Sequence, residues 1–338
     1  MNRKGKLMII LSSIVAMFLL ILDARTALQG AKAGIEIVLN TIVPTLFPFI
    51  YISSIVNKIM AGRQIPFTHW LGKICGIPQG SETILLLGLI SGYPVGAKMN
   101  NDCCVTRQLD PRSARRMLGF CNNAGPAFIF GILLPIFHKP SLVFLLWSVH
   151  ILSAVLTALI LPGKSRQCTT NIQRRATGQF QALLLQAERT VAEISGLVIL
   201  FRILISFLDK YLLSQLPITL TAIVCGLLEL SNGCIALQEI DCEAVRLIVS
   251  ACMISSGGLC VLMQTAAVTK DIGTGMYLPG KIIQAAFSYL MIVPIALAVY
   301  RNIDPILQYA LFVGVPFCIL GIVLTRILLK KHWKSEVA

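Results

Sequence analysis

Long runs of apolar residues constrain the fold of this 338-residue chain more than any other feature of its sequence. About eight runs have the length of about 20 residues that a helix needs to cross a bilayer. We expect these spans at 7–23, 35–60, 113–137, 140–162, 180–209, 244–269, 279–300 and 305–327. Charged residues make up 13% of the chain, whereas soluble domains carry about 25%. The sequence therefore predicts an all-α, multi-pass integral membrane protein in contact with the lipid bilayer.

The first apolar run follows a basic start, Met1 to Lys6, and so resembles a secretory signal peptide. The residues after it, Asp23-Ala24-Arg25, contain no small-x-small cleavage site. We therefore expect residues 1–30 to hold an uncleaved N-terminal transmembrane helix.

Two further apolar stretches, 83–107 and 216–240, are interrupted half-way by residues that break helices. The first break is Ser91-Gly92-Tyr93-Pro94-Val95-Gly96, and the second is Glu229-Leu230-Ser231-Asn232-Gly233. Each arm is too short to cross a bilayer alone. Each stretch is therefore predicted to be a re-entrant helical hairpin, whose irregular turn must be buried in protein or face a water-filled cavity.

The placement of Lys and Arg predicts the orientation in the membrane. With a cytoplasmic N-terminus, 21 of the 29 basic residues fall on the cytoplasmic side, Lys270 and Lys281 among them. This bias follows the positive-inside rule and places both termini in the cytoplasm. The net charge of +14 is then explained by topology, so nucleic acid is not expected as a partner. The first hairpin would enter from the cytoplasmic side and the second from the outer side.

The same order of segments occurs twice: span, broken hairpin, arginine, broken span, span. Arg116 and Arg246 begin the two broken spans, which are interrupted at 121–126 and 255–258. The two copies start in opposite directions, which predicts an inverted-repeat, transporter-like fold. We expect repeats at 31–162 and 179–302, a basic cytoplasmic linker at 163–178, and a C-terminal transmembrane helix with a basic tail at 303–338. A duplicated membrane scaffold without cargo is the alternative.

The four interruptions supply the candidate binding residues, because a broken helix frees backbone N–H and C=O groups for a ligand. In the first half the candidates are Ser91, Gly92, Tyr93, Gly96, Asn122, Asn123 and Gly125. In the second half they are Arg202, Glu229, Ser231, Asn232, Ser255 and Ser256. The alternatives are close helix packing for the glycines and a hydrogen bond between helices for one of the two asparagines.

Glu229 and Arg202 are ionisable residues inside apolar stretches, where a charge is expensive and points to function. Glu229 could hold a coupling ion, H⁺ or Na⁺, or pair with a nearby base. Arg202 could meet a substrate carboxylate with its two-pronged donors, or pair with Glu229 or Glu193. The sequence leaves these alternatives open.

Signatures of enzymes and metal sites are absent from the sequence. The eleven cysteines lack zinc spacing, and there is no HExxH, P-loop or GxSxG motif. We expect no catalytic residue, no metal site and no cofactor, and we expect His150 to be a hydrogen-bonded packing residue. A homo-oligomer is compatible with the sequence, which does not fix the number of subunits.

Two motifs carry a family resemblance: GLISGYPVGAK at 88–98 and FCNNAGPAF at 120–128. They resemble the sporulation integral membrane proteins of the YlbJ type, within the nucleoside-recognition, or Gate, domain group. Residues 226–233 are similar to the second hairpin of that group. The resemblance covers nearly the whole chain.

The resemblance implies a Gate fold similar to that of concentrative nucleoside transporters, with two re-entrant hairpins and two broken helices. It also implies a role in endospore formation, in the cell membrane or the outer forespore membrane. Members of the family are linked to moving dipicolinic acid, a small aromatic dianion, out of the mother cell. Transport of nucleosides or another small solute, or a scaffold role in spore formation, are the alternatives.

Overall fold

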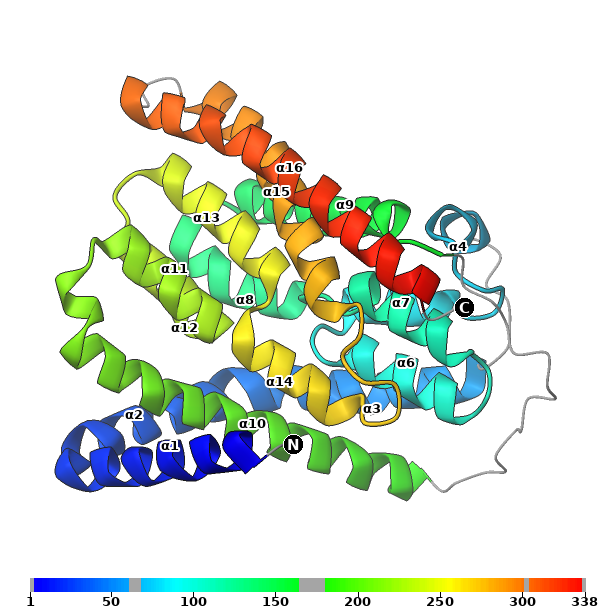
Figure 1. Ribbon diagram of the computed structural model, residues 1–338, viewed down its shortest axis with the longest axis horizontal. Helices are drawn as coiled ribbons and strands as arrows, with labels where there is room; N and C mark the ends of the chain where they lie inside the picture. Colours follow the sequence, from blue (N-terminus) through cyan, green and yellow to red (C-terminus); the bar gives the residue numbers. More distant parts are fainter. Residues whose placement is uncertain (1–2, 61–67, 164–179, 301–303, 336–338) are drawn as a thin grey trace.

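The computed structural model describes residues 3–60, 68–163, 180–300 and 304–335, and all regular secondary structure within these ranges is helical (Figure 1). Seven helical segments in these ranges are long and apolar enough to cross a membrane. They are Ala24–Val56, Pro111–Phe137, Pro140–Ile160, Phe180–Tyr211, Glu243–Val268, Tyr277–Val299 and Pro305–Lys330. The predicted all-α, multi-pass class is therefore confirmed.

The N-terminal region is more helical than the apolar pattern predicts. Helix α1 (Arg3–Leu22) is separated from α2 (Ala24–Ile37) by Asp23 alone. Helix α2 continues through a π-helical turn, η1 (Val38–Ile42), into α3 (Val43–Met60). The span expected at 35–60 therefore starts much earlier, because Asp23 caps α2 by accepting a hydrogen bond from the Thr26 N–H at 3.3 Å.

Helix α2 packs along α10 (Phe180–Tyr211) through its smallest residues. Thr26, Gly30 and Gly34 are its buried residues. A Cβ added to Gly30 would lie 2.9 Å from the Ile203 Cα, and one added to Gly34 would lie 2.9 Å from the Ile199 Cα. Small residues spaced by four allow two membrane helices to approach this closely.

Each of the two interrupted apolar stretches forms a pair of short helices packed against each other. The first pair is α5 (Glu82–Ile90) and α6 (Val95–Val105), joined by a turn in which Gly92 has φ +84°. The second pair is α11 (Ile218–Leu228) and α12 (Leu230–Ala236), which turn at Glu229. Both turns lie at the residues that the sequence identifies as breaks.

The two broken spans are interrupted where the sequence predicts. Helices α7 (Pro111–Cys121) and α8 (Pro126–Phe137) are separated by four non-helical residues. Helices α13 (Glu243–Ser256) and α14 (Gly258–Val268) meet at Gly257, where Gly257 and Gly258 have φ values of +77° and +75°. Only glycine adopts this left-handed backbone without strain, so the pair of glycines fixes the position of this second break.

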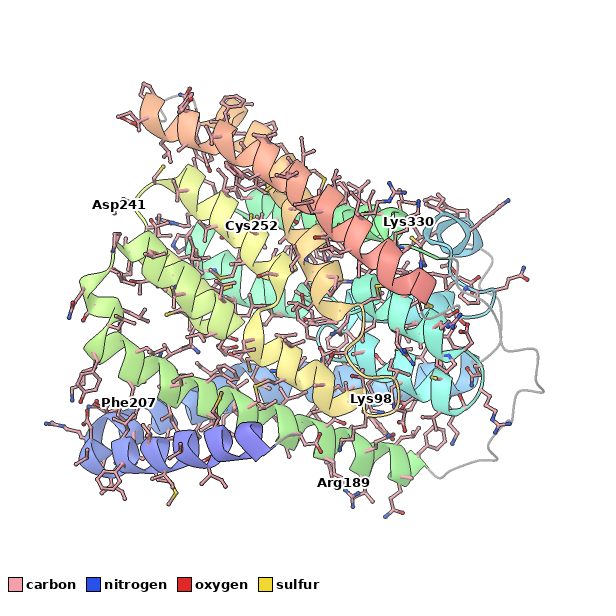
Figure 2. All side chains as sticks on the ribbon, viewed as in Figure 1. Lys98, Arg189, Phe207, Asp241, Cys252 and Lys330 are labelled. Atoms are coloured by element: carbon pink, nitrogen blue, oxygen red, sulfur yellow. The ribbon has the colours of Figure 1, made fainter. Side chains whose placement is uncertain are left out.

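The remaining helices pack around the short-helix pairs and the broken spans. They are α4 (His69–Cys75), α9 (Pro140–Ile160), α15 (Tyr277–Val299) and α16 (Pro305–Ser335), with short 3₁₀ turns η3 (Leu213–Gln215) and η4 (Leu237–Glu239). Figure 1 shows α6 and α12 on opposite sides of α14, which contacts both. Helix α16 packs against α15 and is largely exposed. In Figure 2, Arg189 and Asp241 lie at the edge of the molecule.

Glycines let each short-helix pair press against the neighbouring broken span. A Cβ on Gly88 or Gly96 would lie 1.9 or 2.0 Å from the Cys121 O, so neither position in the first pair has room for a side chain. At the second pair, a Cβ on Gly258 of the broken span would lie 2.6 Å from the Gly226 O. The backbones touch directly at both places.

Two arginines join helix ends in the two halves of the chain. The Arg116 guanidinium donates to the Cys75 O at 2.9 Å and to the Ala158 O at 2.7 Å. The Arg246 guanidinium donates to the Ile240 O at 2.6 and 3.0 Å and to the Ile136 O at 3.3 Å. Each arginine therefore satisfies carbonyls that the ends of other helical segments leave open.

The proposed repeat boundaries stay predictions, and the linker predicted at 163–178 lies outside the described residues apart from Gly163.

Candidate functional site

The turns of the two short-helix pairs, far apart in the sequence, line the same small cavity. Ser91, Gly92 and Tyr93 come from the first turn, and Glu229 and Ser231 come from the second. The interruption between α7 and α8 adds a third wall, which includes Gly125. Six of the residues that the sequence identifies as binding candidates therefore meet around one space.

The cavity has a volume of about 40 Å³. One water needs about 10–15 Å³ on this measure, so a few waters or an ion fit, whereas an organic solute does not. Thr45 and Gln264 add polar groups to the wall, and most of the remaining lining is apolar. The cavity is therefore closed to small organic molecules in this conformation.

The Glu229 carboxylate caps the helix that follows it. Its Oε1 accepts from the Ser231 N–H at 3.1 Å, and its Oε2 accepts from the Asn232 N–H at 2.9 Å and the Asn232 Nδ2 at 2.6 Å. The side chain is 3% exposed. The positive end of α12 and three hydrogen bonds thus stabilise a negative charge at the cavity wall.

The first turn is fixed by contacts with three other elements. The Ser91 and Ser53 hydroxyls lie 2.5 Å apart, which ties the turn to α3. The Tyr93 hydroxyl donates to the Ile254 O in α13 at 3.2 Å. A Cβ on Gly92 would lie 3.0 Å from the Gly125 N, so the turn also touches the α7–α8 interruption.

Asn122 and Asn123 point into the protein interior and do not line the small cavity. The Asn122 Oδ1 accepts from the Ala97 N–H at 3.3 Å, and its Nδ2 donates to the Thr265 Oγ1 at 2.9 Å. The Asn123 Oδ1 accepts from the Lys281 Nζ at 3.1 Å and the Gln284 Nε2 at 3.0 Å. Both asparagines therefore form hydrogen bonds between helices.

Asn123 belongs to a buried polar cluster that joins α9, α13 and α15 to the α7–α8 interruption. Its members are Asn123, His150, Ser255, Lys281, Gln284 and Ser288. His150 Nε2 accepts from the Ala124 N–H at 3.1 Å, which leaves the proton on Nδ1, 3.1 Å from the Ser255 Oγ. The Ser255 and Ser288 hydroxyls lie 2.6 Å apart. His150 is hydrogen-bonded, as expected, within this larger network.

Lys281 is a buried residue that sequence reasoning did not identify as a site candidate. We expected it among the cytoplasmic charges, but it lies in α15 with 1% of its surface exposed. Its Nζ donates to the Gln284 Oε1 at 2.7 Å and lies 5.1 Å from the Tyr93 ring centroid. A signal was present in the sequence: Lys281, Gln284 and Ser288 lie three and four residues apart, on one face of a helix.

The other candidate residues lie outside the small cavity. Arg202 is half-buried on α10, with its Cβ 3.3 Å from where a Gly34 Cβ would be. Within the described residues it forms no salt bridge with Glu229 or Glu193. Gly96 packs against Cys121, and Asn232 supports Glu229, as described above. Ser256 faces a second cavity, beside α16.

These features define a class: a multi-pass integral membrane protein whose broken helices enclose a polar centre. Comparison with known proteins agrees. The chain is similar to the protein named sporulation integral membrane protein YlbJ of Bacillus subtilis (strain 168), with 26% identity over 182 residues. The match covers 50% of this chain and 44% of that relative, so the chain spans less than half of the relative's length. No family model and no solved structure matches the chain.

Proposed function

We propose that this chain is a secondary transporter of a small organic anion, with dipicolinic acid as the favoured cargo. We further propose that it acts in spore formation, at the outer forespore membrane. The observation that carries the proposal is the shared cavity, where turns from both halves of the chain meet beside a broken span. Discontinuous helices that meet near the membrane midplane are the usual binding architecture of transporters with alternating access.

Matching contacts in the two halves support an inverted repeat with two re-entrant hairpins. Arg116 and Arg246, each near the start of a broken span, both bind carbonyls of other helical segments. Gly88 and Gly226, in corresponding arms of the two short-helix pairs, both press against the broken span that follows, at Cys121 and Met253. Such paired contacts are expected of a duplicated unit, and the distribution of basic residues predicts opposite orientations for the two copies.

The proposal assigns the coupling ion, H⁺ or Na⁺, to Glu229. Its carboxylate lies on the wall of a cavity that has room for an ion or a few waters. Ionisable residues at this depth commonly mark ion pathways and proton relays. A cation there would gain the carboxylate together with the Ser91 and Ser231 hydroxyls, which line the same space.

Two considerations support the anionic cargo and the role in sporulation. The relative in Bacillus subtilis is named as a sporulation integral membrane protein. Helices α6, α8 and α14 also begin at the interruptions of this chain, and helix N-termini favour anionic groups. Dipicolinate meets this description as a small aromatic dianion.

Uptake by proteoliposomes tests the proposal. Purified protein is reconstituted, and uptake of labelled dipicolinate and of labelled uridine is followed under a proton gradient, a sodium gradient or neither. We expect gradient-dependent uptake of dipicolinate that protein-free liposomes lack. Uptake of uridine alone would favour the nucleoside alternative. Uptake of neither solute under any gradient would favour the scaffold alternative and overturn the proposal.

A further inference from the structure

His150 lies in the middle of α9, an uninterrupted span that packs against α7, α8 and α13 of the two broken spans. None of its surface is exposed. An ionisable residue buried within a membrane span is expensive and points to function. His150 does not line the small cavity and takes no part in the proposed ion position. The contacts of its two ring nitrogens therefore indicate what it does.

The two ring nitrogens of His150 reach the two interruptions. Nε2 accepts from the Ala124 N–H at 3.1 Å, within the α7–α8 interruption. Nδ1 lies 3.1 Å from the Oγ of Ser255, the last residue but one of α13 before the break at Gly257. One imidazole therefore bridges the two broken spans, with one nitrogen on each.

Only one form of the imidazole makes both contacts. A ring nitrogen that accepts from an N–H carries no proton, so the neutral ring holds its proton on Nδ1 and donates it to Ser255. A protonated ring would set a second donor against the Ala124 N–H and lose that bond. The Gln284 Nε2 lies 3.4 Å from Nδ1 but has other acceptors, the Asn123 Oδ1 at 3.0 Å and the His150 O at 3.2 Å. The bridge thus requires neutral histidine with its proton on Nδ1.

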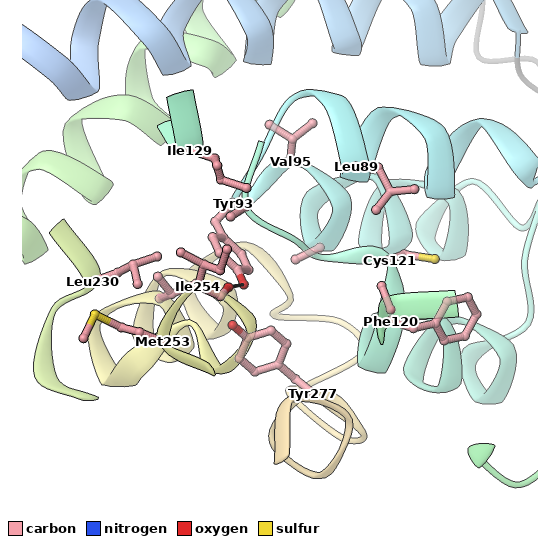
Figure 3. Packing of buried hydrophobic residues seen from close by; sticks show 14 of the residues in the cluster. Leu89, Tyr93, Val95, Phe120, Cys121, Ile129, Leu230, Met253, Ile254 and Tyr277 are labelled. Carbon is pink, nitrogen blue, oxygen red and sulfur yellow. Dashed lines mark hydrogen bonds between the residues drawn. The ribbon is translucent and has the colours of Figure 1, made fainter. Parts of the chain in front are cut away.

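The bridge reaches the wall of the small cavity. Ala124 lines this cavity, so its bond to His150 fixes part of the wall from behind. Tyr93 lines the same cavity, and its hydroxyl donates to the O of Ile254, near the end of α13, at 3.2 Å (Figure 3). The end of α13 is therefore tied to two walls of the cavity, through Tyr93 and through His150.

We propose that His150 is a positioning residue that couples the two broken spans. Its neutral imidazole holds the cavity wall at Ala124 to the end of α13 at Ser255, so a displacement of one interruption displaces the other. The inference deepens the proposed function, because it names the residue that passes a movement of α13 to the wall of the ion cavity. It rests on that function for the effect on transport, whereas the bridge itself is testable without transport.

Hydrogen exchange of the Ala124 N–H, followed at single-residue resolution in the full chain in nanodiscs, tests the coupling. Ser255→Ala leaves the buried Nδ1–H of His150 without its acceptor, which favours the form with the proton on Nε2, opposite the Ala124 N–H. We expect exchange at Ala124 to become about 3- to 10-fold faster, the effect of losing one hydrogen bond. Exchange at the wild-type rate in Ser255→Ala would overturn the inference.

Ser256→Ala is the matched control for this change. The Ser256 hydroxyl donates to the Met253 O within its own helix, so its removal should leave exchange at Ala124 unchanged. Equal acceleration by Ser255→Ala and Ser256→Ala would indicate general loosening of the end of α13 and would also contradict the inference.

Two amide replacements separate the contacts of His150 itself. Gln is one methylene longer than Asn, so the amide of His150→Gln reaches as far as Nε2, whereas that of His150→Asn reaches only as far as Nδ1. We expect exchange at Ala124 within about twofold of the wild type for His150→Gln and about 3- to 10-fold faster for His150→Asn. His138→Asn, at the exposed histidine that follows α8, is the control. The same rate in the Gln and Asn variants would show that His150 only fills space.

NMR of protein labelled with ¹⁵N in its four histidines checks the form of the ring. The spectrum of His150→Gln identifies the His150 signals by their loss. We expect a neutral ring with its proton on Nδ1, and a proton on Nε2 or on both nitrogens would refute the bridge. Failure of the wild type to take up dipicolinate in proteoliposomes would overturn the proposed function and leave the exchange and NMR results unaffected.

Discussion

At the scale of single residues, buried charges in this protein are stabilised in three different ways. Arg116 is held by the carbonyls of two helix ends. Glu229 is held by the N-terminus of a short helix. Lys281 is held by amide oxygens and aromatic rings. Glu229 and Lys281 are thus both held by neutral groups, through hydrogen bonds and dipoles and without an opposite charge beside them.

Changes at Glu229 should separate stability from coupling. Glu229→Ala removes the cap of α12 and should lower the free energy of unfolding by about 1–2 kcal/mol. Glu229→Gln keeps an acceptor oxygen and should unfold close to the wild type, yet lose the stimulation of uptake by an ion gradient. Thermal unfolding and proteoliposome uptake measure the two effects. Normal gradient-driven uptake by Glu229→Gln would rule out the coupling role.

Replacement of Arg116 should be among the most destabilising single changes in the chain. Arg116→Met leaves two buried carbonyls without their charged donor, which should cost about 3 kcal/mol or more. Arg189→Met is the matched control, because Arg189 is exposed on α10 (Figure 2). Unfolding midpoints in detergent compare the two. Equal midpoints would show that the carbonyl contacts of Arg116 contribute nothing to stability.

At the scale of helices, the four breaks in the apolar stretches of the sequence coincide with breaks between helices in the structure. Glycine supplies left-handed backbone at two of them, at Gly92 and at Gly257 and Gly258, and it allows close contact in the arms of the short-helix pairs at Gly88 and Gly226. Local sequence encodes such features directly, because backbone conformation depends mainly on the residue itself and its neighbours. This is why both short-helix pairs and both broken spans could be predicted.

A methyl group at Gly88 should disturb the first short-helix pair. The added Cβ of Gly88→Ala would lie 1.9 Å from the Cys121 O, so the helices must separate. Overpacking of this kind costs about 1–3 kcal/mol. Gly131→Ala is the control, since nothing lies within 4 Å of its Cβ position and alanine favours the helix. Thermal unfolding should show a lower midpoint for Gly88→Ala only; an unchanged midpoint would refute the close contact.

At the scale of the whole molecule, the shared cavity is too small for an organic solute, so the proposed transport would require the short-helix pairs to move. The first pair is tied to α3 through Ser91 and Ser53. It also contacts the α7–α8 interruption through Gly92. Opening must therefore break contacts of the first turn, and the hydroxyl pair is the most accessible of them to experiment.

A disulfide between the first turn and α3 should stop transport reversibly. The Ser53 and Ser91 hydroxyls are 2.5 Å apart, and a disulfide joins two sulfurs at about 2.05 Å. We expect the oxidised Ser53→Cys/Ser91→Cys protein to lose dipicolinate uptake and to regain it on reduction. The Ser91→Cys single variant, treated in the same way, controls for oxidation of native cysteines. Undiminished uptake by the oxidised double variant would show that this turn stays in place during transport.

The sequence by itself determined the membrane class, the positions of most spans and the four interruptions, because hydropathy and helix breaking are local properties. It also placed Ser91, Gly92 and Glu229 among the residues of interest. Tertiary structure alone decided that turns more than a hundred residues apart share a cavity. It also decided that Arg202 lies away from that cavity and that Lys281 is buried. Contacts between distant parts of the chain, such as the hydrogen bond from Lys281 to Asn123, depend on how the helices pack. No local pattern of residues encodes that packing.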